Sequence, residues 1–398
     1  MASITAKYFS IATAITLSLG LAPAWAQSGN INILASSSAL SSNAPLTDYN
    51  GSIWGTNNYT GGVFAYTPGN NNIPVYSGTT TGQYNGLVVD GFSLYMDAGG
   101  GMYSINTQTA VTADYADGLA SGARGNMTPV GSSLYGATAS GFNNYGGIFS
   151  YNINNSSLAK QLIGFSNTNG AMPESALNDI NGIFYGTTLE GGLYGDGTIF
   201  SFNPQMNTIN SLFSFNGADG KLPYNIAGMT YNNGILYGTT SGGGSGGGGT
   251  LFALNVANDT LSTLENFVYS GTGTVMNSSP IYASGILYGT TNYGGAYNDG
   301  MIYSYNVNNN SFSDVADFSG NTSHPDNGVL DINQVLYGEA NGNIYDISGY
   351  QAPQFYTDTT LNITTPSDSS SVPEPSSALS VVFGALALFL LRRRHFSA

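Results

Sequence analysis

The sequence contains no cysteine. Disulfide bonds, thiolate metal sites and thiol redox chemistry are therefore excluded. Histidine is nearly absent as well, with only His324 and His395 in the chain. A Ser–His–Asp triad in the body of the protein would have to use His324, and a histidine-based zinc site lacks ligands.

Charged residues are scarce: they make up 7% of the 398 residues, against about 25% in an average soluble domain. Four of the seven basic residues lie at the two ends, Lys7 near the start and three arginines at 392–394. Between the ends, three basic residues face 22 acidic ones, a net charge of −19. Such a body repels phosphate backbones, so we expect no nucleic-acid partner.

Turn-forming and aromatic residues fill the gap, with 55 glycines and 28 tyrosines, and hydrophobic residues reach 41%. Glycine and asparagine tolerate the positive φ angles of tight turns. Clusters of good helix formers are rare outside the termini. The composition therefore predicts an all-β fold of short strands with a sizeable core.

The first 26 residues have the three parts of a signal peptide. Lys7 supplies a positive start, residues 11–21 form the apolar stretch, and Ala24-Trp25-Ala26 is an A-x-A site. We expect signal peptidase to cleave after Ala26. The alternative is a buried core helix.

Residues 366–398 form a second distinct segment. A polar spacer at 367–371 is followed by a Pro-Glu-Pro motif, an apolar run at 378–391 and three arginines. The run is short for a membrane span of about 20 residues, but snorkelling of the arginines brings it close to spanning. The positive-inside rule keeps the arginines cytoplasmic. We expect a transmembrane helix in the inner membrane with the body outside.

This tail resembles the PEP-CTERM sorting signal of Gram-negative bacteria. The residues that carry the resemblance are Val372, Pro373, Glu374, Pro375, Arg392, Arg393 and Arg394. The resemblance implies that an exosortase-like protease is a partner, that it cleaves near the Pro-Glu-Pro motif, and that the protein passes to the cell surface or extracellular matrix. The logic parallels a GPI signal, whose hydrophobic tail is only an address. The alternative is a permanent anchor.

The body is a tandem repeat. An aliphatic or Phe residue, an aromatic residue and then usually Gly-Thr recur seven times, at spacings of 40 to 52 residues. The aromatic residues are Trp54, Tyr95, Tyr135, Tyr185, Tyr237, Tyr288 and Tyr337. A second strand-like motif follows each copy, at residues 62–66, 101–105, 147–151, 198–202, 250–254, 301–305 and 343–347.

Two further short segments complete each unit, as at 209–215 and 225–231. Four short antiparallel strands in 40 to 52 residues are typical of a propeller blade. Seven units predict a seven-bladed β-propeller, with residues 30–35 as the outer strand that closes the last blade. An open β-solenoid is the alternative. The predicted organisation is a signal peptide at 1–26, the propeller at 27–365 and the sorting tail at 366–398.

The repeats resemble the Gly-rich GloVer-type tandem repeats of bacterial surface proteins, best over residues 184–318. The first, second and last units depart from the pattern: Met96-Asp97 replaces Gly-Thr in the second, and Glu339 replaces Thr in the seventh. The resemblance implies architecture and export, without a fixed activity.

No catalytic constellation is visible. His324 precedes Pro325, at the loop position that Leu222-Pro223 and Ser279-Pro280 hold in other units, which indicates a turn residue. The scattered carboxylates Asp179, Glu190, Asp196, Asp219 and Asp299 have no local signature. Asp-Gly at 196 and 299 is turn chemistry, with weak Ca²⁺ ligation as the alternative. We expect no cofactor, and residues 242–249 lack the Lys of a phosphate-binding loop.

Tyrosines recur in one Gly-rich inter-strand loop of three different units. They are Tyr145, Tyr194, Tyr293 and Tyr297. Aromatic rings among hydrogen-bonding side chains can stack on sugars, so these loops predict an exopolysaccharide-binding face. Three function classes stay open: a non-catalytic surface or matrix protein, a propeller glycoside hydrolase or lyase with carboxylates in an axial pocket, and a purely structural repeat.

Both ends of the chain should be removed during export. Mass spectrometry of the protein recovered from cells should show Gln27 as the first residue and no Arg392. An intact C-terminal tail in the final location would contradict sorting by cleavage and support the permanent anchor.

Overall fold

The structure is a computed structural model that describes residues 30–348 with short gaps. The gaps are residues 38–39, 41, 43, 58–61, 71–72, 78–85, 98–100, 110–111, 117–124, 155–158, 270, 273–278 and 326. Ala24, Ala26 and the sorting tail that begins at residue 366 lie outside this part, as do residues 349–365 of the expected propeller domain. Within the described part, no helix could cross a bilayer.

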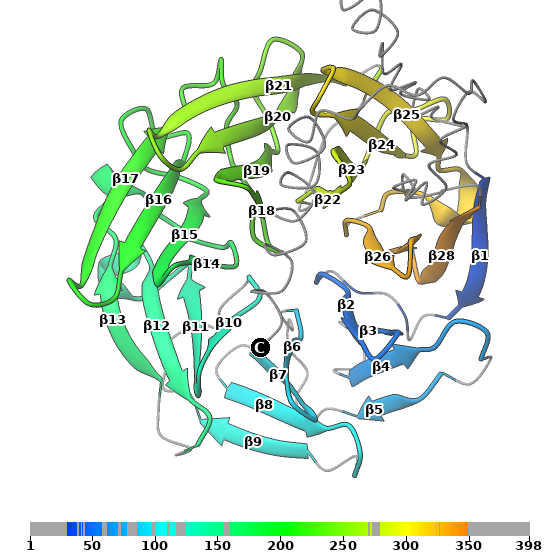
Figure 1. Ribbon diagram of the computed structural model, residues 1–398, viewed down its shortest axis with the longest axis horizontal. Coiled ribbons are helices and arrows are strands. Elements are labelled where there is room, and N and C mark those ends of the chain that lie inside the picture. Colours follow the sequence, from blue (N-terminus) through cyan, green and yellow to red (C-terminus); the bar gives the residue numbers. More distant parts are fainter. Residues whose placement is uncertain are drawn as a thin grey trace, which may run out of the picture. The chain divides into compact units, whose positions relative to one another are not determined.

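The described chain forms seven four-stranded antiparallel sheets, arranged as the blades of a ring (Figure 1). The innermost strands have three residues each: β2 (Thr47–Tyr49), β6 (Val88–Asp90), β10 (Thr128–Val130), β14 (Asn178–Ile180), β18 (Thr230–Asn232), β22 (Ile281–Ala283) and β26 (Leu330–Ile332). The second strands hold the Gly-Thr motifs: β3 (Ser52–Asn57), β7 (Ser93–Asp97), β11 (Ser133–Thr138), β15 (Ile183–Thr188), β19 (Ile235–Thr240), β23 (Ile286–Thr291) and β27 (Val335–Ala340).

The outer half of each blade completes the sheet. The third strands are β4 (Gly62–Tyr66), β8 (Gly101–Asn106), β12 (Gly147–Asn152), β16 (Thr198–Asn203), β20 (Gly247–Asn255), β24 (Met301–Asn306) and β28 (Asn343–Ser348). The outermost strands are β5 (Val75–Ser77), β9 (Thr112–Ala116), β13 (Lys160–Gly164), β17 (Thr208–Ser214), β21 (Thr260–Val268), β25 (Ser311–Asp317) and β1 (Asn30–Ser36). The all-β, seven-bladed prediction is therefore confirmed.

The ring closes through its first strand. β1 pairs with β28, with Asn30 opposite Ser348 and Ile31 opposite Ile347. This confirms that residues 30–35 complete the last blade, and the open β-solenoid is wrong. Closure removes the free sheet edges that an open solenoid would leave at its two ends.

One cross-strand contact recurs in six blades. The motif glycine of the second strand faces an aromatic ring on the third strand, and a Cβ placed on Gly238 would lie 2.5 Å from Cζ of Phe252. The other pairs are Gly55 with Phe64, Gly136 with Phe149, Gly186 with Phe200, Gly289 with Tyr303 and Gly338 with Tyr345. All six rings are fully buried. The glycine is present because the ring occupies the space of a side chain.

The core lies between the blades. Seven clusters of buried apolar residues each join two neighbouring blades, including the pair that closes the ring. The motif aromatics take part in these interfaces: Tyr237 of blade five stacks on Tyr282 of blade six with ring centroids 6.0 Å apart, whereas Trp54 stacks on Tyr76 of its own blade at 5.4 Å. Burial raises the pKa of Tyr237 above its ordinary value.

Hydrogen bonds join several blades near the axis. The first residue of an innermost strand donates a side-chain bond to the carbonyl just before the next innermost strand. The bonds run from Thr47 to Leu87, from Thr128 to Leu177, from Asn178 to Met229 and from Thr230 to Pro280.

The segment predicted at 225–231 is a strand only from Thr230. Asn225 instead lies in the connection between blades, where its buried side-chain amide bonds the backbone N–H and carbonyl of Thr239. The amide thus replaces the backbone pairing that a longer strand would have made.

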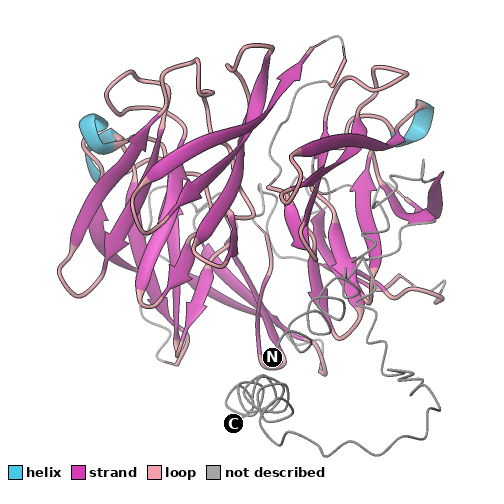
Figure 2. Ribbon diagram, turned by 45° about the horizontal axis from the view of Figure 1, so that its top comes forward, coloured by secondary structure: helices cyan, strands magenta, loops and turns pink. Residues whose placement is uncertain are grey.

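The two faces of the propeller differ. Connections between second and third strands, and those between blades, lie on one face, which we call the loop face. The 3₁₀ turns η2 (Phe142–Asn144), η3 (Asn167–Asn169) and η4 (Gly320–Thr322) belong to it, along the upper edge of Figure 2. The tight turns that leave the first and third strands lie on the opposite face, the turn face.

Two tyrosines on β24 should respond oppositely to loss of their hydroxyls. The Tyr303 hydroxyl is buried without a hydrogen-bond partner, and four other blades have Phe at this position. Tyr303→Phe should therefore raise the free energy of unfolding in urea by about 1 kcal/mol. Tyr305→Phe is the matched control: it removes a 3.1 Å bond to Asn310 Oδ1 and should cost about 0.5–1.5 kcal/mol. Equal losses in both variants would contradict the packing described for β24.

Candidate functional site

Exposed tyrosines gather on the loop face. Those expected from the sequence lie in loops β11–β12, β15–β16 and β23–β24, of blades three, four and six. Their exposed fractions are 39% for Tyr145, 59% for Tyr194, 42% for Tyr293 and 65% for Tyr297. Ring surface is thus open to solvent on three blades of one face.

The loops are held in place by the outermost strands. Ser214 Oγ accepts the N–H of Leu193, Asn266 Oδ1 that of Ser245, and Asp317 Oδ1 that of Ala296, each across 21 residues. The residue after each bonded N–H is Tyr194 in blade four, Gly246 in blade five and Tyr297 in blade six. Tyr194 and Tyr297 therefore occupy equivalent positions.

The other two tyrosines take different positions in the loop. Tyr145 precedes Gly146, as Asp196 precedes Gly197, and its carbonyl accepts the N–H of Met172 at 3.0 Å. Tyr293 packs on the imidazole of His324, with ring centroids 4.7 Å apart. The four rings therefore occupy more than one position in these loops.

A fifth exposed tyrosine was not expected from the sequence. Tyr269 follows the outermost strand of blade five and is 61% exposed. A Cβ on Gly247 would lie 3.3 Å from its ring, so the ring lies beside the Gly-rich loop that has no aromatic residue of its own. Exposed tyrosines thus occur on blades three to six without a break. The signal available in the sequence was the run of glycines at 242–249, which only Ser245 interrupts.

His324 is a turn residue. Its φ is 54°, its N–H bonds the carbonyl of Asp299 at 2.7 Å, and its Nδ1 lies 2.8 Å from the carbonyl of Asn292. Leu222 has the same φ and bonds the carbonyl of Asp196. The predicted equivalence with Leu222-Pro223 is confirmed, with Met172-Pro173 as a third copy.

Ser279-Pro280 is not part of that set. Pro280 directly precedes β22, and Ser279 Oγ bonds Asn225 Oδ1 at 3.1 Å. The sequence comparison placed it wrongly because Pro280 lies directly before the strand, whereas Pro223 and Pro325 lie several residues before β18 and β26.

The two Asp-Gly pairs form turns. Gly197 and Gly300 both have φ of 97°, and a Cβ on either would lie 2.3 Å from a carbonyl oxygen of the second strand. Asp299 Oδ2 accepts the N–H of Gly320. In the part of the chain that the structure describes, no three His, Cys, Asp or Glu side chains group as metal ligands.

Negative charge surrounds these loops. Burial and the neighbouring Asp317 raise the pKa of Asp314 to about 6, so this carboxylate takes up a proton in mildly acidic solution. Among the described residues, Lys160 and Lys221 are the sole Lys or Arg side chains. The face suits uncharged ligands better than anions.

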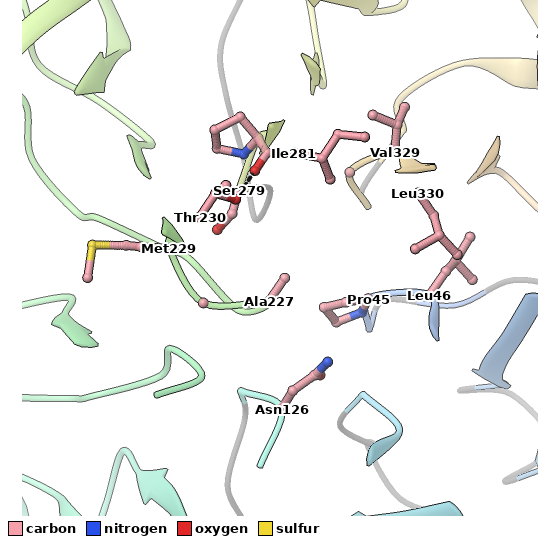
Figure 3. A pocket seen from close by; sticks show the side chains of 13 residues that line it. Pro45, Leu46, Asn126, Ala227, Met229, Thr230, Ser279, Ile281, Val329 and Leu330 are labelled. Atoms are coloured by element: carbon pink, nitrogen blue, oxygen red, sulfur yellow. Dashed lines mark hydrogen bonds between the residues drawn. The ribbon is translucent and has the colours of Figure 1, made fainter. Parts of the chain in front are cut away.

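The ring encloses an axial cavity of about 240 Å³ (Figure 3). Residues just before the innermost strands line it, among them Leu46, Asn126, Met229, Ser279 and Val329. The Asn126 side-chain carbonyl is buried without a partner. None of the thirteen lining residues is titratable.

The carboxylates considered as an acid–base pair do not meet in this cavity. Asp179 accepts a turn N–H from Gly182 on the turn face. Glu190, Asp196, Asp219 and Asp299 lie in loop-face segments, and none of the five lines the axial cavity.

A family model, the Gloeobacter/Verrucomicrobia repeat, matches residues 122–350, which is more than half of the chain. The chain belongs to the Gloeobacter/Verrucomicrobia repeat family. A search of curated proteins found no match.

Solved structures share the propeller fold. The repeat protein is similar to the extracellular domains of a one-component system and a hybrid two-component system of B. thetaiotaomicron, both at TM-score 0.56 and 81% coverage, with 13% and 15% identity. It spans 40% and 42% of those chains. Virginiamycin B lyase from Staphylococcus aureus matches at TM-score 0.56 and 11% identity, with 80% and 98% of the two chains covered. At these identities the likeness concerns the fold alone.

Proposed function

We propose that this protein is a non-catalytic, exported component of the cell surface or extracellular matrix that binds neutral or weakly acidic exopolysaccharide on its loop face. The observation that carries the proposal is the set of exposed tyrosines on blades three to six of that face. Aromatic rings cover the apolar faces of sugars, and several weak sites along one polymer add up through effective concentration.

Export is supported by the two ends of the sequence. The A-x-A site at Ala24 and Ala26 fits signal peptidase. The Pro-Glu-Pro motif and terminal arginines fit an exosortase-like sorting protease, with the tail held briefly in the inner membrane of a Gram-negative bacterium. Two structures of the same fold are extracellular domains, which agrees with this location.

The chemistry of the cavity favours binding over catalysis. A glycosidase needs two carboxylates about 5–10 Å apart at the scissile bond, and the lining of the axial cavity holds none. The described lining of this cavity therefore gives the enzyme alternative no support. The purely structural alternative does not account for the exposed aromatic rings. Apolar ring surface in contact with water is unfavourable in free energy when no partner covers it.

Net negative charge sets the ligand class. Strongly anionic polymers should be repelled by the body unless Ca²⁺ bridges the two. A glycan array run with and without Ca²⁺ therefore tests the ligand class directly.

Loss of the two equivalent tyrosines should weaken binding. Each stacked ring contributes about 0.5–1.5 kcal/mol, by analogy with aromatic pairs, so Tyr194→Ala and Tyr297→Ala should each reduce affinity about 2- to 12-fold for the neutral glycan that the array selects. Tyr231→Ala is the control, since Tyr231 is 45% exposed on an innermost strand away from these loops. No binding to any glycan, or binding unchanged in the Tyr194 and Tyr297 variants, would leave the structural repeat as the better description.

A further inference from the structure

A second groove opens on the turn face, between blades one and two. Its volume is about 240 Å³, and Tyr49, Trp54 and Phe92 supply its aromatic lining. The Phe92 ring is 56% exposed, although it stands in the tight turn between β6 and β7. The groove lies on the opposite face from the tyrosine loops and shares no residue with them.

Hydrogen bonds fix the aromatic walls. Thr107 donates its N–H to the Phe92 carbonyl at 2.8 Å, and its hydroxyl lies 3.4 Å from the hydroxyl of Tyr49. The rings of Tyr49 and Trp54 meet edge to face, with centroids 6.4 Å apart. Trp54 is 6% exposed, so the wall is held by the core between the two blades.

The remaining lining is polar and uncharged. It consists of Asn50, Ser52, Thr107 and Gln108. The side-chain amides of Asn50 and Gln108 form no hydrogen bond with any described residue, whereas Ser52 Oγ is bonded to Thr67. Each free amide offers both donors and an acceptor, which matches a sugar hydroxyl that donates and accepts at once.

The lining of this groove offers no positive charge to an anionic ligand. No basic residue lines it. The nearest carboxylate along the chain, Asp48, is engaged by the N–H of Gly51 at 3.0 Å. The volume is below the roughly 300–1,000 Å³ of most small-molecule sites, which suits one ring of a longer chain.

We propose that this groove binds a neutral sugar unit of a polysaccharide, with Phe92 and Tyr49 stacking on the ring and Asn50 and Gln108 binding its hydroxyls. This proposal is independent of the proposed binding on the loop face. If both faces bind, one molecule joins two polysaccharide chains, and the protein acts as a cross-link in a matrix.

Tryptophan fluorescence can report binding in the groove. Tryptophan occurs twice, at Trp25 in the expected signal peptide and at Trp54 in the groove. In the full chain with Trp25→Phe, tryptophan emission reports the groove alone. The Trp54 ring is part of the groove lining, so its emission should change when a sugar displaces water from the groove.

Titration with the neutral hexasaccharides cellohexaose, maltohexaose and laminarihexaose should shift Trp54 emission for at least one of them. Phe92→Ala and Gln108→Ala should weaken that response about tenfold, while circular dichroism stays unchanged because both side chains are exposed. Met206→Ala, an exposed apolar residue on the turn face of blade four, should have no effect. Tyr194→Ala and Tyr297→Ala should leave the response intact.

Three outcomes would contradict the proposal that this groove binds a sugar. They are no emission change with any neutral hexasaccharide, a response that survives Phe92→Ala, and a response to choline alone, which would make the groove a quaternary ammonium site. If the array finds binding that depends on Tyr194 while emission is silent, the groove fails and the proposed function stands. If emission responds and the loop variants bind normally, the groove stands and the loop-face proposal fails.

Discussion

The contact on which the structure depends is the close approach of an aromatic ring to the motif glycine of the neighbouring strand. In six blades a ring atom lies between 2.3 and 2.7 Å from the ideal position of the glycine's Cβ. The aromatic side chain covers the backbone that glycine leaves bare, which restores packing to a residue that is otherwise poor in strands. The ring of Phe252 also belongs to the buried cluster shared with the preceding blade. Each glycine–aromatic pair thus stabilises both the sheet of its blade and the interface with the neighbouring blade.

Blade two shows what happens without the glycine. Met96 stands opposite Tyr103, and Tyr103 is only half-buried, whereas its six counterparts are fully buried. Met96 is itself buried, at 3% exposed. The groove proposed as a sugar site lies beside this blade. Blade two thus departs from the repeat both in its core, at Met96, and at the surface beside it, where the groove lies. Binding sites commonly occur in the parts of a fold that core packing leaves free to vary.

The sequence predicts the fold well because its signals are local. Seven copies of one motif at near-regular spacing give the blade number, and residues 30–35 match the missing outer strand. Surfaces formed by separate segments are harder to predict. Tyr269 lies beside the Gly-rich loop although some 20 residues separate them, and the turn-face groove joins Trp54 to Gln108 of the next blade. The one local sign was tryptophan in place of the motif tyrosine at position 54.

A double-mutant cycle on Gly238 and Phe252 tests the central contact most directly. Gly238→Ala alone should cost about 1–3 kcal/mol through overpacking, and Phe252→Leu alone should destabilise by leaving space beside the glycine. In the double variant the smaller leucine leaves room for the new methyl group. Its loss of unfolding free energy in urea should therefore be smaller than the sum of the two single losses by about 1 kcal/mol or more. Strictly additive losses would show that the two residues are not coupled and would contradict this account of the blade.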